Sequence, residues 1–277
     1  MRVRTSHLSS DGARLETQGW FKVVARIGLS ARGVIYVLSG YLAFDLARHG
    51  SSPAQASGDG TLHEVARQPA GPALLAALAV GLGAYAAWRF VQALAAKANP
   101  EQRSVLAQRI GWLATAAIYL WLCLQSIELI VSRSSTSRTT GSPEPWAAKA
   151  LSWPAGSVVL GIVGACLILA GATLAIWGFA HDFDKDLALE QLSTTLRRSV
   201  KALGATGDLA RGFLVSLVGV YLMEAAVVGN PALAKSTDEA LKSLLRTPYG
   251  PSLIALVAVG LVFYGLYSFS EGRLRRI

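Results

Sequence analysis

Three acidic side chains stand at one shared position of a pattern that the sequence repeats three times. Each follows an opening glycine by the same 17 residues, and the three are Asp45, Glu128 and Glu224. If the repeats surround an axis, their carboxylates form a ring, and repulsion between like charges favours binding of a cation. The alternative is that each carboxylate lies close enough to a helix end to reach solvated headgroups.

A second polar position lies near the start of each repeat. Arg32 and Arg211 occupy it in the first and third copies, and Thr115 occupies it in the second. Tyr36 and Tyr119 lie one helical turn further on, on the faces of Arg32 and Thr115. A guanidinium can bind an anionic headgroup or solute through two hydrogen bonds, or it can extend along its helix to lipid phosphate. We therefore take these five residues, with the three acids, as candidate binding residues.

The sequence contains no recognisable catalytic or metal signature. Asp182, Asp184 and Asp186 begin like a calcium loop, but Leu187 stands where that loop needs glycine and Ser193 where it needs glutamate. The 2 cysteines lie apart in apolar runs, and the 4 histidines are scattered. We assign no catalytic residue, no metal site and no cofactor, which favours a protein that is not an enzyme.

The composition indicates a chain that lies in lipid. Hydrophobic residues make up 52% of the 277 residues and charged residues 16%, a balance typical of membrane proteins. A helix needs about 20 apolar residues to cross the hydrocarbon core, and six stretches meet this length. They are residues 27–47, 72–96, 110–131, 155–180, 209–228 and 251–270.

The basic residues predict the orientation of these spans. The N-terminal tail (1–19, expected to be disordered), the second and fourth loops and the C-terminus hold about twice as many Lys and Arg residues as the other loops. Both termini are therefore expected in the cytoplasm. The net charge of +9 is spread beside apolar segments, so we expect membrane lipids as partners, with another membrane protein as a further candidate and no nucleic acid.

The chain consists of three copies of a two-helix unit. The opening GLSARG at 28–33 recurs as GDLARG at 207–212 and, more weakly, as GWLATA at 111–116. The units cover 20–100, 101–182 and 183–277. A unit with two spans returns the chain to the same side, so all copies share one orientation. We predict an all-α integral membrane bundle of six helices with pseudo-threefold symmetry about the membrane normal.

Each unit also contains a short external helical segment that ends at a proline. Thr61 with Glu64, and Ser236 with Glu239, have the spacing of a capping box. Before the fifth span, leucines at helical spacing in 189–203 predict an amphipathic helix at the cytoplasmic surface.

Several elements occurring together resemble the bacterial family grouped as domain of unknown function 1206. They are the GxxARG opening, the aromatic residue after it, the PxGP turn before the second span and the ending from Gly81 to Trp88 and Arg89. The likeness extends over residues 20–277, and the second repeat departs most, with Thr115 in place of arginine and Ser157 in place of a proline. The resemblance implies a fold and a location in the bacterial cytoplasmic membrane, and no particular activity.

The ionisable residues within the spans concentrate in the odd-numbered ones. Charge in hydrocarbon is expensive, so we expect spans one, three and five at the centre and spans two, four and six toward lipid. This arrangement favours passage or binding of a small ion or solute near the axis, with the three acids at the outer mouth and Arg32 and Arg211 at the inner one. The alternative is a non-catalytic scaffold or accessory protein that binds lipid or another membrane protein.

Overall fold

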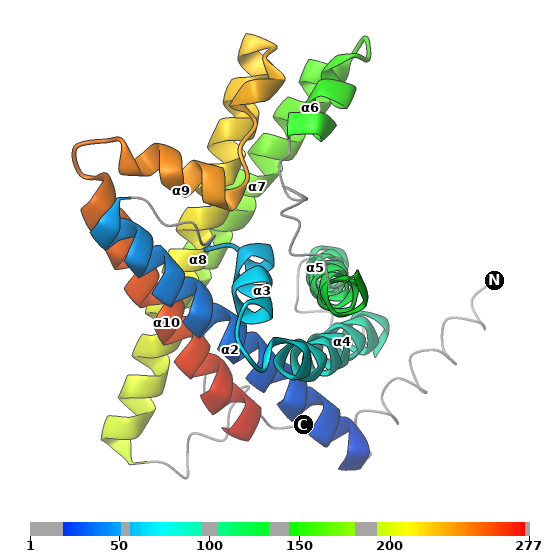
Figure 1. The fold of residues 1–277 in the computed structure, drawn as a ribbon, viewed down its shortest axis with the longest axis vertical. Helices are drawn as coiled ribbons and strands as arrows, with labels where there is room; N and C mark the ends of the chain where they lie inside the picture. Colours follow the sequence, from blue (N-terminus) through cyan, green and yellow to red (C-terminus); the bar gives the residue numbers. More distant parts are fainter. Residues whose placement is uncertain (1–18, 51–55, 96–104, 133–143, 181–192, 275–277) are drawn as a thin grey trace, which may run out of the picture.

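The computed structural model describes residues 19–50, 56–95, 105–132, 144–180 and 193–274 (Figure 1). Six of the described helices are long and apolar enough to cross a membrane. They are α2 (Gly19–His49), α4 (Gly71–Ala95), α5 (Val105–Ser132), α7 (Gly156–Ala180), α8 (Thr194–Val228) and α10 (Gly250–Leu274). The described ranges contain no strand. The predicted all-α membrane fold with six spans is confirmed.

Short helices connect the two spans of each unit. They are α3 (Gly58–Ala66), α6 (Glu144–Leu151) and α9 (Thr237–Leu245). At α9 the capping box of Ser236 and Glu239 is present as predicted. At α3 the predicted box is wrong, because the helix begins earlier: Ser57 is the N-cap and accepts from the backbone N–H of Gly60. Thr61 is therefore inside the helix, where its hydroxyl donates to the carbonyl of Ser57 at 2.8 Å.

The fifth span is longer than the bilayer requires. Helix α8 runs unbroken through 35 residues, which is about 50 Å at 1.5 Å per residue. The part of the predicted surface helix that is described, from Thr194 onward, is thus helical but is the first section of α8 rather than a separate element. The acidic residues expected to precede it lie outside the described residues.

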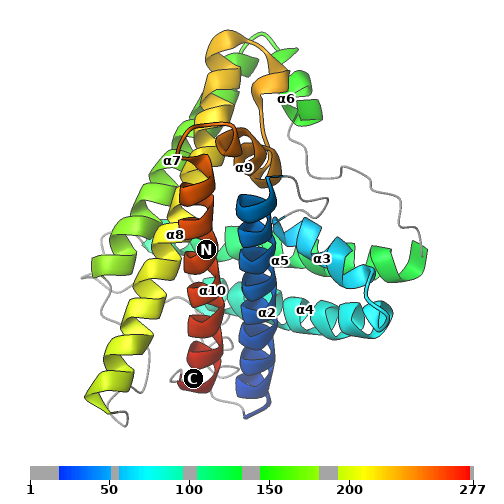
Figure 2. The same cartoon turned by 60° about the vertical axis from the view of Figure 1, so that its left-hand side comes forward.

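The spans pack as three close pairs, α2 with α10, α4 with α5 and α7 with α8, which lie side by side in both views (Figures 1 and 2). Each pair joins an even-numbered span to an odd-numbered span of the next unit, and small residues set the close approach. A Cβ added at Gly33 would lie 3.0 Å from the carbonyl oxygen of Gly265, and one added at Gly212 would lie 2.4 Å from that of Gly171. In the α4–α5 pair, the thiol of Cys123 donates to a carbonyl of α4 at 3.2 Å.

The contacts between pairs are unequal. Within the first unit α2 packs on α4, and within the third α8 packs on α10, whereas α5 and α7 of the second unit make at most marginal contact in the described part of the chain. The α4–α5 pair runs across the direction of the α2–α10 pair (Figure 2). A regular threefold about the membrane normal therefore stays a prediction.

The expected division into central odd spans and peripheral even spans is wrong. The buried share of the most apolar stretch is 56% in α2 and 50% in α10, whereas it is 22% in α5 and 28% in α8. The centre is the α2–α10 pair, one odd and one even span. Charge was a poor guide to position because Glu128 of α5 and Glu224 of α8 lie on exposed faces near helix ends.

Candidate functional site

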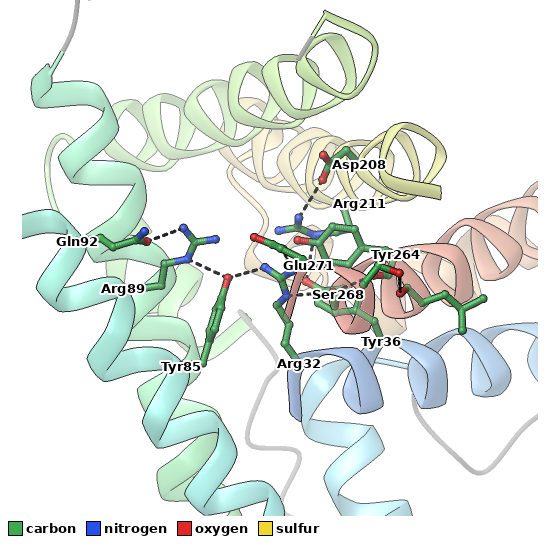
Figure 3. Close-up of polar contacts among 12 residues, drawn as sticks. Arg32, Tyr36, Tyr85, Arg89, Gln92, Asp208, Arg211, Tyr264, Ser268 and Glu271 are labelled. Carbon is green, nitrogen blue, oxygen red and sulfur yellow. Dashed lines mark hydrogen bonds and ion pairs between the residues drawn. The ribbon is translucent and has the colours of Figure 1, made fainter. Parts of the chain in front are cut away.

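Arg32 lies at the centre of a polar cluster where α2, α4, α8 and α10 meet (Figure 3). Its side chain is 2% exposed. The guanidinium donates to the hydroxyl of Tyr85 at 2.6 Å and to the hydroxyl of Ser268 at 3.1 Å, and it forms an ion pair with the carboxylate of Glu271. Burial of a charge is tolerated where its donors are paired, so this contact ties α2 to both α4 and α10.

Arg211 occupies the matching place in the third unit but has different partners. Its Nε donates to the hydroxyl of Tyr36 at 3.1 Å, and its Nη1 pairs with Asp208 of the same helix at 3.1 Å. The ring of Tyr264 lies between the two arginines, with guanidinium carbons 5.0 Å (Arg32) and 4.2 Å (Arg211) from the ring centre. Both are cation–π distances, so one ring positions both charges (Figure 3).

A third guanidinium extends the cluster along α4. Arg89 donates to the hydroxyl of Tyr85 at 2.9 Å and to the amide oxygen of Gln92 at 3.0 Å. The residues joined by these contacts therefore contain three arginines and two carboxylates, a surplus of one positive charge. Among the described residues, no three His, Cys, Asp or Glu side chains gather where they would hold a metal ion. The chemistry available at the cluster is that of guanidinium and phenol groups, which bind anions.

The tyrosines of the cluster form two matching edge-to-face pairs. Tyr85 and Tyr119 have ring centres 4.5 Å apart, and Tyr264 and Tyr36 have ring centres 4.7 Å apart. Each pair joins an even span to the odd span of the next unit, so the two contacts are equivalent in the repeat. Such pairs are favourable beyond the area they bury, and they help hold Tyr36 and Tyr119 where their rings border a cavity.

A cavity of about 420 Å³ lies beside Arg211. Tyr36, Tyr119 and Arg211 line one part of it, and Ser57 and Asp59 of the first external segment line another. The rest of the wall is mostly apolar and comes from five of the spans: Ile35, Ile118, Leu122, Leu167, Leu214, Val215, Val218 and Leu261. On the α5 side, Ile118 is 60% and Trp121 50% exposed, so the cavity opens along this helix, next to the edge where α5 and α7 separate.

The structure brings four of the eight candidate residues together. Arg32, Arg211, Tyr36 and Tyr119 belong to one cluster, although Arg32 lies behind the cavity wall and does not line it. Thr115 is apart from the cluster, since its hydroxyl donates to the carbonyl of Gly111 in its own helix at 2.7 Å.

The three acids of the repeat do not line the cavity. The carboxylate of Asp45 lies 2.9 Å from the ring Nδ1 of His49 in the next turn of α2. Glu128 and Glu224 are exposed. Their shared position in the sequence is therefore not a shared place on the cavity wall.

Sequence reasoning missed most of the groups that complete the cluster: Tyr85, Arg89, Asp208, Tyr264, Ser268, Glu271 and, at the cavity, Asp59. One signal was available, because Tyr85 and Tyr264 match between the first and third units, as Gln92 and Glu271 also do. Glu271 was passed over because it lies one residue beyond the predicted end of the sixth span, whereas α10 continues to Leu274.

Six apolar helices arranged as repeated two-helix units around a charged cluster define a multi-pass membrane protein. The chain belongs to the family described as Domain of Unknown Function (DUF1206), whose profile matches residues 27–96, 110–181 and 206–275. These three matches confirm the repeats and the resemblance. The chain is similar to "Uncharacterized protein YxxB" of Bacillus subtilis (strain 168), with 28% identity over 273 residues that cover 98% of this chain and 97% of the relative. No solved structure matches it significantly.

Proposed function

We propose that the chain binds a small anionic solute in the cavity, with Arg211 as the group that receives it. The observation that carries this proposal is the position of Arg211, a half-buried guanidinium on the wall of a 420 Å³ cavity. That volume is typical of pockets for small molecules. The surplus positive charge of the cluster favours an anion over a cation, and the neighbouring phenol of Tyr36 offers a further polar contact.

The walls also indicate what else the solute contains. Leucine, isoleucine and valine side chains from α5, α7 and α8 line the space between Arg211 and the external segment, so a ligand that fills it carries an apolar part. The opening lies along α5, whose apolar side chains are largely exposed and would face the bilayer. An amphiphilic anion, from lipid or from the aqueous phase, matches both features.

Arg32 has a different task in this proposal. Each of its three guanidinium nitrogens has a partner and it does not line the cavity, but its guanidinium also lies over the ring of Tyr264, which Arg211 contacts as well. Arg32 is thus a positioning residue, and Arg211 is the one that touches the ligand.

Binding is tested with caproate as the probe, titrated calorimetrically into the purified full chain in detergent. Arg211→Gln is expected to lower the affinity for caproate at least about tenfold, since a charged hydrogen-bonding partner is lost. Arg246→Gln removes one positive charge at the end of α9, away from the cavity, and is expected to bind like the unaltered protein. Equal affinity in all three proteins would refute the proposal. Efflux of caproate from proteoliposomes then distinguishes passage from binding alone.

We further infer that the protein lies in a bacterial cytoplasmic membrane with both termini in the cytoplasm. Supporting this, the first turns of α2 and α8 and the last turn of α10 lie at the same end of the molecule (Figure 2), and they carry Lys22, Arg26, Arg198, Lys201 and Arg273. A C-terminal fusion to alkaline phosphatase, which needs export for activity, is expected to be inactive in cells. Phosphatase activity of the fusion would contradict this orientation.

A scaffold or accessory role is the second candidate, and one observation favours it. Only 17% of the most apolar stretch of α7 is buried, and α7 contains no Asp, Glu, Lys, Arg or His. Such a face suits lipid or an apolar helix of another membrane protein. Copurification of a stoichiometric partner that is lost when α7 is altered at Val159 and Ile162 would support this role, and a monodisperse monomer without partners would exclude it.

A further inference from the structure

Asp59 is the acidic residue on the cavity wall, and one of its oxygens has no partner. It lies in the first turn of α3, after the N-cap Ser57. Its Oδ1 is buried and has no hydrogen-bond partner in the described structure. Buried polar atoms are nearly always paired, so an orphan on a cavity wall is a candidate ligand contact.

Asp238 occupies the matching place in the third unit and shows what Asp59 lacks. Both acids lie two residues after the serine that caps their helix, Ser57 for α3 and Ser236 for α9. The Oδ1 of Asp238 accepts from the backbone N–H of Ser57 at 2.8 Å, which ties the third external segment to the first. Asp59 would need the same contact from the second unit, where α6 packs on α7 and α8 rather than beside α3.

The charges around Asp59 favour a cationic partner. Burial raises the pKa of Asp59, and the carboxylate of Asp238 raises it further, while the His63 ring and a hydrogen bond with Trp121 lower it. Oδ1 itself has almost no accessible surface, whereas Asp59 as a residue lines the cavity. An ammonium group that binds the carboxyl group after a turn about its Cβ–Cγ bond would supply the missing donor and offset the repulsion between the two carboxylates.

Arg211 and Asp59 thus border one cavity with opposite charges. The α8 residues that line the space extend from Arg211 to Val218, which is about 10 Å along the helix axis. Asp59 belongs to the external segment beyond this stretch. Thr237, the residue before Asp238, lines the cavity together with Asp59. The wall between the two charged groups is mainly apolar.

We propose that the ligand is a zwitterion with an apolar middle, whose anionic end binds Arg211 and whose ammonium end binds Asp59. This inference rests on the proposed binding function and adds the second charged group of the ligand. Free amino acids whose amine is several methylenes away from the carboxylate have this chemistry.

The test compares three probes on the purified full chain in detergent: ε-aminocaproate, caproate and hexylamine. The unaltered protein is expected to bind ε-aminocaproate about tenfold more tightly than caproate, because one charged hydrogen bond is added. In Asp59→Asn this preference disappears while caproate still binds in a manner that depends on Arg211, at an affinity that is kept or raised because one negative charge has left the cavity wall. Arg211→Gln is expected to bind both ε-aminocaproate and caproate more weakly than the unaltered protein does. Zinc or calcium binding that competes with hexylamine at Asp59, in place of any preference for ε-aminocaproate, would overturn the inference.

Asp238→Asn is the matched control. It removes the tie to Ser57, so it is expected to lower the unfolding temperature without changing the preference for ε-aminocaproate. Asp59→Asn is expected to leave the unfolding temperature unchanged or higher, because an unpaired buried carboxylate is removed. If caproate binding depends on Arg211 but Asp59→Asn keeps the preference, the zwitterion is refuted and the anion site stands. If Arg211→Gln has no effect on any probe, the binding function itself fails.

Discussion

Arg32 and Arg211 occupy the same place in the first and third repeats, yet they have different surroundings. The side chain of Arg32 is 2% exposed and is paired with a carboxylate from another span, whereas that of Arg211 is 22% exposed, takes its carboxylate from its own helix and borders a cavity. The same residue at equivalent positions thus has two roles: Arg32 joins two spans in the first unit, and Arg211 is a candidate ligand contact in the third.

The difference comes from the neighbouring span rather than from the arginines. Arg32 packs against α10, which supplies Ser268 and Glu271. Arg211 lies on α8, which packs closely on α7. In α7 the place of Ser268 is taken by Leu174, as the matching glycine contacts of the two pairs show. Because α7 offers no charged partner, the contacts of Arg211 in the described structure use its Nε and Nη1, and its Nη2 keeps donor capacity on a residue that lines the cavity.

Asp59 and Asp238, the equivalent acids of the two external helices, also differ in their partners. Asp238 accepts a hydrogen bond from the first unit, whereas Asp59 borders the second unit and has one oxygen without a hydrogen-bond partner. Both open groups lie beside the second repeat, the copy that departs most from the shared pattern. The second repeat has Thr115 in place of arginine and an uncharged α7, so Arg211 and Asp59, which lie beside it, lack partners that Arg32 and Asp238 find in the other units.

The largest expected effect comes from the buried ion pair. Glu271→Gln leaves the charge of Arg32 without its counterion and is expected to lower the free energy of unfolding by about 3 kcal/mol. Asp208→Asn breaks a more exposed pair within one helix and is expected to cost about 1 kcal/mol. Denaturant unfolding of the detergent-solubilised chain measures both, and equal losses would show that the two arginines are not differently placed.

Replacing each arginine by lysine separates structural from binding roles. Lysine keeps the charge but loses the planar fork. Arg211→Lys is expected to weaken caproate binding by about fivefold with little change in unfolding. Arg32→Lys cannot satisfy Tyr85, Ser268 and Glu271 together, so it is expected to lower stability, and to lower the caproate affinity of the folded protein less than Arg211→Lys does. Reversal of these outcomes would exchange the roles of the two residues.

The pH dependence of ligand preference tests Asp59. Its pKa is raised by burial and by Asp238, so as the pH falls Asp59 takes up a proton in the folded protein before an exposed aspartate would. The protonated acid has no charge for an ammonium. The preference for ε-aminocaproate over caproate is therefore expected to decline as the pH falls, and to do so at a higher pH than that at which an exposed aspartate takes up its proton. The ratio of the two affinities cancels most of the titration of the carboxylate that the probes share. A preference independent of pH, or one that grows on acidification, contradicts the assignment.

The smallest effect is expected from giving Arg211 a partner like that of Arg32. Leu174→Ser restores the hydroxyl that α10 supplies through Ser268. One added neutral hydrogen bond to Arg211 is expected to reduce caproate affinity about two- to threefold. Leu174→Ala, which shortens the side chain without adding a hydroxyl, is the control in the same titration. Identical affinities in the two variants would mean that the polarity of α7 does not set the availability of Arg211.

Much of the fold followed from the sequence because its signals are local. Apolar length fixed the six spans, recurrence of the GxxARG opening fixed the three units, and Ser236 with Glu239 fixed the start of α9. The site followed only in part. Among the candidate residues, Arg32, Arg211, Tyr36 and Tyr119 lie in one cluster. The shared position of Asp45, Glu128 and Glu224 did not bring them to the cavity, because equal positions in a repeat meet only if the repeats pack alike.

The sequence by itself therefore determined which segments are long and apolar enough to span a membrane and which residues recur, since hydrophobic length and repetition are properties of the chain alone. Only the tertiary structure decided that α2 and α10 form the centre, that Arg32 is sealed and Arg211 accessible, and that Asp59 keeps an unpaired oxygen. The physical reason is that burial and charge pairing depend on the neighbouring span, and glycine-mediated contacts between units that are distant in sequence choose that neighbour.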